Sequence, residues 1–252
     1  MTTPIIGKSA QETSLVGQHS AKDIPTQERL ILALDVPSES HAKALVTELG
    51  SSVQFYKLGL ELFMAGGYFE LVKWLRDQQK QVFVDLKFFD VPKTVERAVQ
   101  QLKKYDVSFA TVHGNDNILE AACTAKNGIK ILAVTVLTSL DEADMKALGF
   151  EVPIKDVVLS RARRALKIGC DGVISSGLEA QDLRNELGDR FIIVVPGIRP
   201  GSNSEDDQKR TVDVEDAFRN GADYIVVGRP IKNAPNPREA AENFQQRIAS
   251  IF

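Results

Sequence analysis

The sequence has few of the residues that bind metal ions or form disulfides. Its 252 residues include two cysteines, Cys123 and Cys170, and three histidines, His19, His41 and His113. The cysteines do not form a C-x-x-C pair, and the histidines do not have the spacing of a metal-ligand set. We therefore expect two inert thiols rather than a disulfide or a zinc site.

Long apolar runs and an excess of positive charge are absent as well. No stretch approaches the roughly 18 apolar residues of a membrane span. Residues 1–28 lack the basic segment followed by an apolar segment that marks a secretory signal. The net charge of −3 and the pI near 5.7 do not favour a nucleic-acid-binding surface. We expect a polar leader over residues 1–28 of a cytoplasmic protein that binds neither membranes nor nucleic acids.

Short apolar runs alternate regularly with amphipathic segments from residue 29 onward. Strands are expected at residues 29–34, 53–58, 83–87, 107–112, 129–136, 172–175, 191–195 and 223–227. Between them apolar residues recur at helical spacing, as Ala42, Leu45, Val46 and Leu49 do before Gly50. Eight such units without a shift in composition predict an α/β protein, a single (β/α)₈ TIM barrel over residues 29–252. An open doubly wound sheet is the alternative, but its usual glycine-rich first turn is missing.

Two connections are longer than the others. Residues 138–156 precede a long helix, and capping-box spacing from Ser139 to Glu142 with a stop at Gly149 predicts a short extra helix there. Residues 196–210 follow the seventh strand and are polar and rich in glycine and proline. A connection of that composition and length is typical of a lid or a binding loop.

Charged residues gather at the carboxyl ends of the first three expected strands. Asp35 follows the first strand, Lys57 lies in the second, Asp85 and Lys87 lie in the third, and Asp90 follows it. Reacting groups of barrel enzymes lie at this end. Alternating carboxylates and ammonium groups keep one another ionised without a metal. The sequence thus favours a catalytic charge array, and a set of structural ion pairs at the barrel mouth is the alternative.

The loops after the seventh and eighth strands have the composition of a phosphate site. The first contains Gly197, Arg199 and Gly201, and the second contains Gly228 and Arg229. Glycines let backbone N–H groups approach phosphate oxygens, and arginine binds these oxygens in a bidentate manner. We expect a phosphorylated small ligand.

Among the histidines, only His113 could face such a site, because it follows the fourth strand. The glycine after it, Gly114, makes a structural role in a turn at least as good an interpretation. His41 lies on an expected helix, and His19 lies in the leader.

The segment from Asp85 to Thr94 resembles the D-x-K-x-x-D-x-P-x-T signature of the bacterial type of orotidine 5′-phosphate decarboxylase family. The resemblance runs from about Leu30 to the C-terminus. It includes Lys57-Leu-Gly, Pro-Gly-Ile-Arg199-Pro and Val-Gly-Arg229-Pro. Sugar-phosphate decarboxylases of the same suprafamily share D-x-K-x-x-D, so the proline–threonine extension and the two arginine loops make the match specific.

The resemblance implies decarboxylation of orotidine 5′-phosphate to UMP and CO₂ in de novo pyrimidine synthesis, without metal or organic cofactor. It implies that Lys87 donates a proton to C6 of the pyrimidine and that Asp85 faces the substrate carboxylate. Lys57 and Asp35 would hold ribose hydroxyls and complete the charge array.

The same resemblance implies a homodimer in which Asp90 and Thr94 reach the neighbouring subunit's site. Thr138, with Ser139 as a second candidate, would contact the pyrimidine. The residues expected to bind the phosphate are Arg199, Gln208, Gly228 and Arg229.

Two other functions remain open from the residues alone. One is a metal-assisted decarboxylase or epimerase of a keto-sugar phosphate on the same barrel. The other is a barrel that binds a phosphorylated ligand without catalysis.

Overall fold

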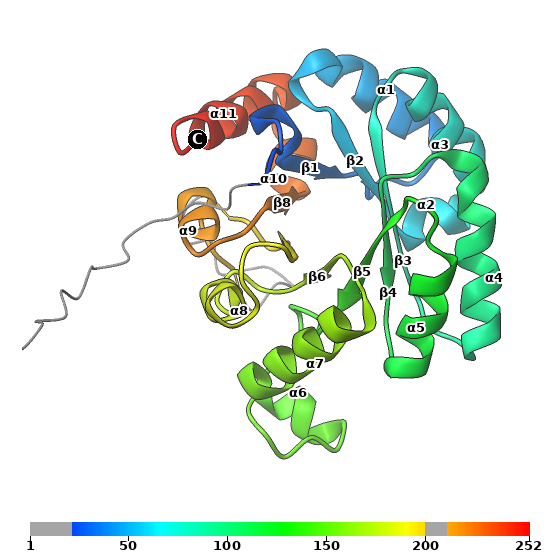
Figure 1. The fold of residues 1–252 in the computed structure, drawn as a ribbon. Coiled ribbons are helices and arrows are strands. Elements are labelled where there is room, and N and C mark those ends of the chain that lie inside the picture. Colours follow the sequence, from blue (N-terminus) through cyan, green and yellow to red (C-terminus); the bar gives the residue numbers. More distant parts are fainter. Residues whose placement is uncertain (1–21, 200–210) are drawn as a thin grey trace, which may run out of the picture.

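Eight parallel strands close into a barrel in the order of the chain (Figure 1). The computed structural model describes residues 22–199 and 211–252. The strands are β1 (Leu30–Ala33), β2 (Phe55–Leu58), β3 (Gln81–Phe88), β4 (Phe109–Val112), β5 (Lys130–Val134), β6 (Gly172–Ile174), β7 (Ile192–Val195) and β8 (Tyr224–Val227). The predicted barrel and all eight predicted strands are confirmed.

Helices cover the outside of the barrel (Figure 1). They are α1 (Glu39–Leu49), α2 (Leu60–Ala65), α3 (Tyr68–Asp77), α4 (Pro92–Leu102), α5 (Asp116–Ala125), α6 (Glu142–Ala147), α7 (Ile154–Ile168), α8 (Ala180–Leu187), α9 (Val214–Arg219), α10 (Arg229–Lys232) and α11 (Pro237–Ala249). None of the helices in residues 22–199 and 211–252 has the length and apolar character needed to cross a membrane.

The alternation of side chains along the strands produces two apolar layers. In β3, Val84 points outward and packs in the layer between strands and helices, whereas Phe83 points into the barrel. Inside the barrel, Phe109 lies 5.0 Å from Phe55 and 5.1 Å from Tyr224 between ring centroids. These aromatic side chains fill the barrel interior, so a ligand has room only beyond them, towards the carboxyl ends of the strands.

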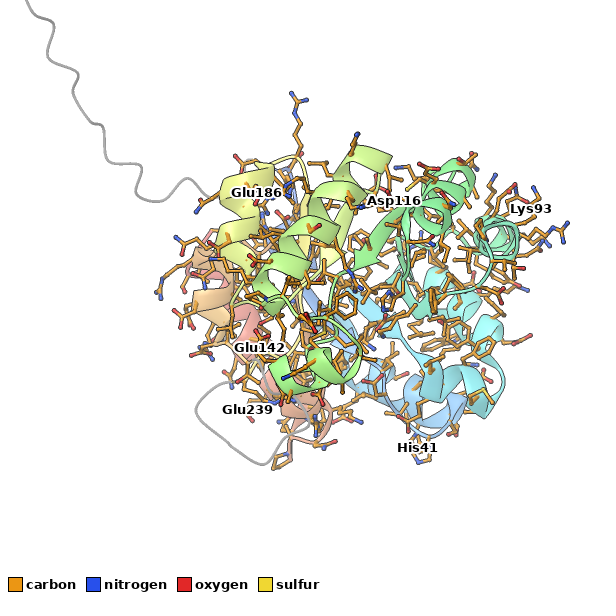
Figure 2. All side chains as sticks on the ribbon, turned by 90° about the horizontal axis from the view of Figure 1, so that it is seen from below. His41, Lys93, Asp116, Glu142, Glu186 and Glu239 are labelled. Atoms are coloured by element: carbon orange, nitrogen blue, oxygen red, sulfur yellow. The ribbon has the colours of Figure 1, made fainter. Side chains whose placement is uncertain are left out.

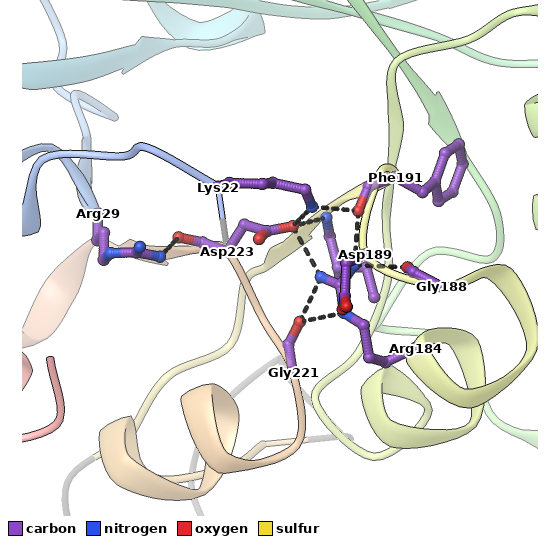
Figure 3. A network of polar contacts seen from close by, with 9 residues as sticks. Lys22, Arg29, Arg184, Gly188, Asp189, Phe191, Gly221 and Asp223 are labelled. Atoms are coloured by element: carbon purple, nitrogen blue, oxygen red, sulfur yellow. Dashed lines mark hydrogen bonds and ion pairs between the residues drawn. The ribbon is translucent and has the colours of Figure 1, made fainter. Parts of the chain in front are cut away.

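A polar network closes the opposite end of the barrel (Figure 3). Arg184 of α8 and Lys22 both contact the Asp223 carboxylate, which is fully buried beside β8, at 2.8 Å and 2.6 Å. Arg29 donates a hydrogen bond to the Asp223 carbonyl and lies over the Phe252 ring. Residues 22–28 were predicted as part of the leader, but Lys22 contacts the barrel through Asp223. Burial of Lys22 lowers its pKa to about 8.

The short extra helix is confirmed, but its predicted N-terminal cap is wrong. The capping box joins Asp141 and Asp144, with both backbone-to-carboxylate bonds at 3.0 Å. Glu142 instead accepts a hydrogen bond from the backbone of Ile154. The spacing S-x-x-E occurs in the sequence, but the helix begins two positions later, where Asp141 and Asp144 accept hydrogen bonds from each other's backbone N–H. Gly149 follows the helix with φ +87°, as expected of a stop.

Candidate active site

A cavity of about 460 Å³ opens at the carboxyl ends of the strands. Eight of the residues predicted for the site line it: Asp35, Lys57, Asp85, Lys87, Thr138, Arg199, Gly228 and Arg229. Ser139, the second candidate for the pyrimidine contact, lines it as well. The fold thus gathers side chains from β2 and β3 and from the loops after β1, β5, β7 and β8 around one space.

Four charged side chains form a continuous chain of ion pairs along this cavity. Lys57 Nζ lies 3.3 Å from Asp35 Oδ1 and 3.4 Å from Asp85 Oδ2. Lys87 Nζ lies 2.9 Å from Asp85 Oδ1. We call Asp35, Lys57, Asp85 and Lys87 the charge array. Lys57 and Asp85, at the centre of the array, each have a partner of opposite charge on both sides. These ion pairs compensate for the free-energy cost of burying the two charges.

The two side chains at the centre of the array are the most buried. The side chains of Lys57 and Asp85 are 12% and 11% exposed, whereas that of Asp35 is 43% exposed. Burial alone would raise the pKa of Asp85, but Lys57 and Lys87 outweigh it and lower that pKa. Burial likewise would lower the pKa of Lys57, and the two carboxylates beside it raise it instead. Both groups therefore stay charged at neutral pH.

A break in the sheet places Lys87. The pairing of β3 with β4 is regular to Val84 and shifts before Phe88, and Lys87 has a φ of +48°. The fully buried Thr111 of β4 spans the break. Its Oγ1 donates a hydrogen bond to Asp85 Oδ1 at 2.9 Å and accepts one from the Lys87 backbone N–H at 3.0 Å. The Thr111 hydroxyl thus takes the place of a backbone carbonyl as the hydrogen-bond partner of the Lys87 N–H. It holds the backbone of Lys87 in a conformation that L-residues rarely adopt.

The other side of the cavity carries cationic side chains on the loops after β7 and β8. The ends of the loop after β7 are joined by a parallel bridge between Ile198 and Val212, which fixes the backbone of Arg199. Arg229 begins α10, and Lys232 lies one turn further and donates a hydrogen bond to the Asp35 carbonyl. Positive charge at this end suits an anionic group of a ligand.

Apolar residues line the same cavity. They are Val134, Val136, Ile174 and Val226. Thr138, which is buried, also lines it. The cavity therefore combines charged, hydroxyl and apolar side chains, as a site for a small polar ligand does.

Two predicted site residues, Asp90 and Thr94, do not line this cavity. Asp90 and Thr94 are exposed at the start of α4, and the Asp90 carboxylate accepts a hydrogen bond from the backbone of Val91 at 2.6 Å. Gln208 lies outside the described residues. Within one chain, the array therefore contains four of the five charges expected at the barrel mouth.

His113 lies in a second cavity, of about 750 Å³, between the loop after β3 and the helices α5 and α7. Its ring centroid is 5.4 Å from that of Phe89, and Gly114 follows with φ +122°. Burial and the nearby cations Arg161 and Lys87 lower its pKa, so the ring is neutral at pH 7. The position favours the structural interpretation of this histidine over a role in the charge array.

The second cavity is bordered by charged and apolar side chains. Asp116, labelled in Figure 2, pairs with Arg164 of α7 at 2.5 Å on its edge. Phe89 and Val152 are exposed there, at 69% and 51%.

Two residues of the site escaped the sequence analysis. Thr111 is uncharged and belongs to no motif, but it lies two positions after the inward-facing Phe109, so its side chain faces the barrel interior too. Lys232 lies three positions after Arg229, on the same side of a helix. Strand parity and helix spacing were the signals that could have found them.

The chain is similar to known proteins over most of its length. The family model described as "Orotidine 5'-phosphate decarboxylase / HUMPS family" matches residues 28–244. The chain is 61% identical to the orotidine 5′-phosphate decarboxylase of Methylococcus capsulatus over 92% of this chain and 97% of that protein. It is 50% identical to the enzyme of the same name from Stenotrophomonas maltophilia, over 89% and 94%.

Solved structures resemble the chain as well. The crystal structure of orotidine 5′-phosphate decarboxylase from Lactobacillus acidophilus superposes with a TM-score of 0.78 at 34% identity, over 88% of this chain and 99% of that one. A crystal structure of an uncharacterised conserved protein from Geobacillus kaustophilus superposes with a TM-score of 0.74 at 30% identity, over 87% and 99%.

Proposed function

Because the chain belongs to the orotidine 5′-phosphate decarboxylase / HUMPS family, we propose that it is a carboxy-lyase that converts orotidine 5′-phosphate to UMP and CO₂. This reaction belongs to de novo pyrimidine synthesis, and we place it in the cytoplasm. The observation that carries the proposal is the chain of ion pairs from Asp35 to Lys87, in a cavity that also holds Arg199 and Arg229.

The reaction demands stabilisation of negative charge at carbon. Loss of CO₂ from C6 leaves a carbanion that no carbonyl group of the ring is placed to delocalise. In the cofactor-independent mechanism we propose, fixed charges of the protein stabilise it. The Lys87 ammonium group beside C6 lowers the energy of the carbanion and then donates its proton to that carbon. Its bond to Asp85 Oδ1, at 2.9 Å, holds the ammonium group in place before the substrate enters.

Asp85 faces the substrate carboxylate in this mechanism. Its carboxylate is ionised and fixed by Lys57, Lys87 and Thr111, so it cannot turn away from a second negative charge. The repulsion raises the energy of the bound substrate and is relieved as CO₂ leaves. Lys57 and Asp35 hold ribose hydroxyls, which completes their polar contacts at the more exposed end of the array.

The remaining contacts orient the nucleotide. Thr138 binds the pyrimidine, with Ser139 beside it in the same cavity. The phosphate is bound by Arg199, Gln208, Gly228 and Arg229, of which Gln208 rests on the resemblance alone. Binding energy from the phosphate, remote from C6, then contributes to ordering the site around the reacting carbon.

We propose that the active form is a homodimer. Asp90 and Thr94 do not line their own chain's cavity, and both are exposed at the start of α4. Asp90 is flanked by Phe89 and Val91, which are 69% and 63% exposed, an arrangement that favours burial against another surface. In the dimer, Asp90 and Thr94 enter the partner's site and supply the charge missing from the array.

The test is the fall in absorbance of orotidine 5′-phosphate mixed with the purified full-length protein in EDTA. Turnover to UMP under these conditions is the expected result. Activity that requires added Mg²⁺ and a keto-sugar phosphate would replace the proposal with the metal-assisted alternative. Binding of UMP without any turnover would support the non-catalytic barrel.

A further inference from the structure

The two cysteines, which the sequence separates by 47 positions, are in contact in the fold. Cys123 Sγ lies 3.5 Å from Cys170 Sγ, and both thiols are free. Cys123 belongs to the last turns of α5, and Cys170 lies between the end of α7 and the start of β6. The sequence predicted two inert thiols and gave no sign of this contact.

Lys126 connects the end of α5, which carries Cys123, to the loop that carries Cys170. Lys126, at the end of α5, donates hydrogen bonds to the Gly169 carbonyl at 2.8 Å and to both carboxylate oxygens of Asp171 at 3.0 Å. These are the residues on either side of Cys170. Asp171 also accepts from the backbone of Ile131, which ties this loop to β5. The thiols therefore meet in a part of the structure that polar contacts fix on both sides.

The two thiols differ in access and in acidity. Cys123 is half-buried, whereas Cys170 is 4% exposed. Their shared hydrogen bond lowers the pKa of Cys123 and raises that of Cys170, and Lys126 contributes to the lower value at Cys123. Cys123 is thus the thiol that ionises first and that a reagent can reach.

We propose that Cys123 and Cys170 form a site of reversible oxidation, at which a small disulfide such as oxidised glutathione converts the thiol pair to an intramolecular disulfide. The Cys123 thiolate attacks one sulfur of the oxidant, which forms a mixed disulfide and releases one thiolate. Cys170 then attacks Cys123 Sγ and passes its proton to the second leaving thiolate. Two protein thiols are oxidised, and one oxidant disulfide is reduced to two thiols.

The bond would close a loop containing β5, α6 and α7. Cys170 precedes β6 by two residues, so the pair lies at the amino ends of the strands, whereas the charge array lies at their carboxyl ends. Closing a loop of this length restricts the unfolded chain more than the folded one. Oxidation should therefore stabilise the fold and leave the geometry of the cavity unchanged.

The experiment treats the reduced full-length protein with excess oxidised glutathione, then measures intact mass, free thiols and thermal unfolding. The expected product is monomeric in mass, lacks two hydrogens, has no free thiol and melts about 5–10 °C higher. Dithiothreitol should reverse every change. A wild-type protein that keeps two free thiols, or that stops with a glutathionyl group on Cys123, would overturn the proposal.

Matched variants separate the two steps. Cys170→Ser should stop at one glutathionyl group, because the resolving thiol is gone, and Cys123→Ser should react far more slowly, because the remaining thiol is buried. Cys170→Ala serves the same purpose if the serine variant does not fold. UMP affinity equal in the reduced and oxidised wild type is the expected control. A loss of more than about tenfold in that affinity would contradict the separation of the thiol pair from the cavity.

Discussion

At the scale of single residues, Asp85 and Lys57 show how neighbours overcome burial. Both side chains are nearly buried, and burial alone would favour their neutral forms. Their mutual contact, with Lys87 and Asp35 outside them, shifts each pKa in the direction that keeps the charge. The array is therefore stable as a unit, and the loss of one member leaves a buried charge without its partner.

Replacing Asp85 by asparagine should reveal this coupling as a function of pH. The folded-state pKa of Asp85 lies below its unfolded value of about 3.9, so its contribution to stability is complete above that pH and is lost as pH falls through the folded pKa. We expect Asp85→Asn to lower the free energy of unfolding by about 3–5 kcal/mol at pH 7. The difference from wild type should shrink below about pH 4.

Urea unfolding between pH 7 and pH 3 measures this difference. Asp116→Asn is the matched control, because the Asp116–Arg164 pair is at the surface, and its removal should change stability by less than about 1 kcal/mol. A difference between Asp85→Asn and wild type that does not vary with pH would contradict the coupling.

Thr111 is the residue through which the fold positions Lys87. Thr111→Val keeps the shape but leaves the Lys87 N–H and one Asp85 oxygen without this partner. We expect a loss of stability of about 1–3 kcal/mol and a fall in kcat of roughly 10–100-fold with little change in KM. The pKa of Asp85, followed by NMR, should rise.

Thr111→Ser retains the hydroxyl and should recover most of kcat and the Asp85 pKa. Thr135→Val removes another buried hydroxyl, which bonds the Ile174 carbonyl, and serves as a control for general destabilisation. Equal losses of kcat in Thr111→Ser and Thr111→Val would show that the hydroxyl does not position Lys87.

At the scale of elements, the eight strands and the long helices could be predicted, whereas two of the short helices could not. The long helices repeat apolar residues at helical spacing over ten or more positions, and the strands are short apolar runs between them. The six-residue helix α6 was predicted from capping-box spacing and the stop at Gly149 rather than from a period. The helices α2 and α10 contain six and four residues, too few for a period to be recognised, and neither was predicted. The break between β3 and β4 also escaped, because nothing in Val84–Phe88 marks a shift of register that depends on a threonine in the next strand.

The short helix α10 matters for function because Arg229, its first residue, lines the cavity. Arg229→Ala should weaken UMP binding about 10–100-fold, because a bidentate contact to a doubly charged group is lost. Uridine, which lacks the phosphate, should lose less than about twofold. Isothermal titration calorimetry with both ligands measures the contrast.

Arg219→Ala is the control for this variant, since Arg219 lies on the neighbouring helix α9 and pairs with Asp216 at the surface. It should bind UMP as the wild type does. Equal losses for UMP and uridine in Arg229→Ala would remove Arg229 from the phosphate site.

At the scale of the whole molecule, the sequence predicted the closed barrel, and most of the residues predicted for the site gather at one end of it. Eight of the predicted site residues line one cavity because parallel strands in a closed barrel bring their carboxyl ends together. Asp90 and Thr94 are different, because neither lines the cavity of its own chain, and in the proposed homodimer they would reach the partner's site. Contacts between chains cannot be deduced from periodicity within one.

Hybrid dimers test this assembly. Mixing Asp90→Asn chains with Lys87→Ala chains should restore up to about a quarter of wild-type activity, because one of the two sites in a heterodimer is intact. Activity is measured after subunit exchange, and native mass spectrometry measures the heterodimer fraction. No recovery in a sample that contains heterodimers would exclude shared sites.

The most direct test of the central claim is the effect of Lys87→Ala on decarboxylation and on UMP binding in the same preparation. Lys155→Ala, which removes an exposed lysine of α7 paired with Asp182, is the matched control. The account predicts a fall in kcat of at least about 10⁴-fold for Lys87→Ala with UMP binding still measurable, and unchanged kinetics for Lys155→Ala. Turnover by Lys87→Ala within about tenfold of wild type would contradict the assignment of Lys87 as the proton donor.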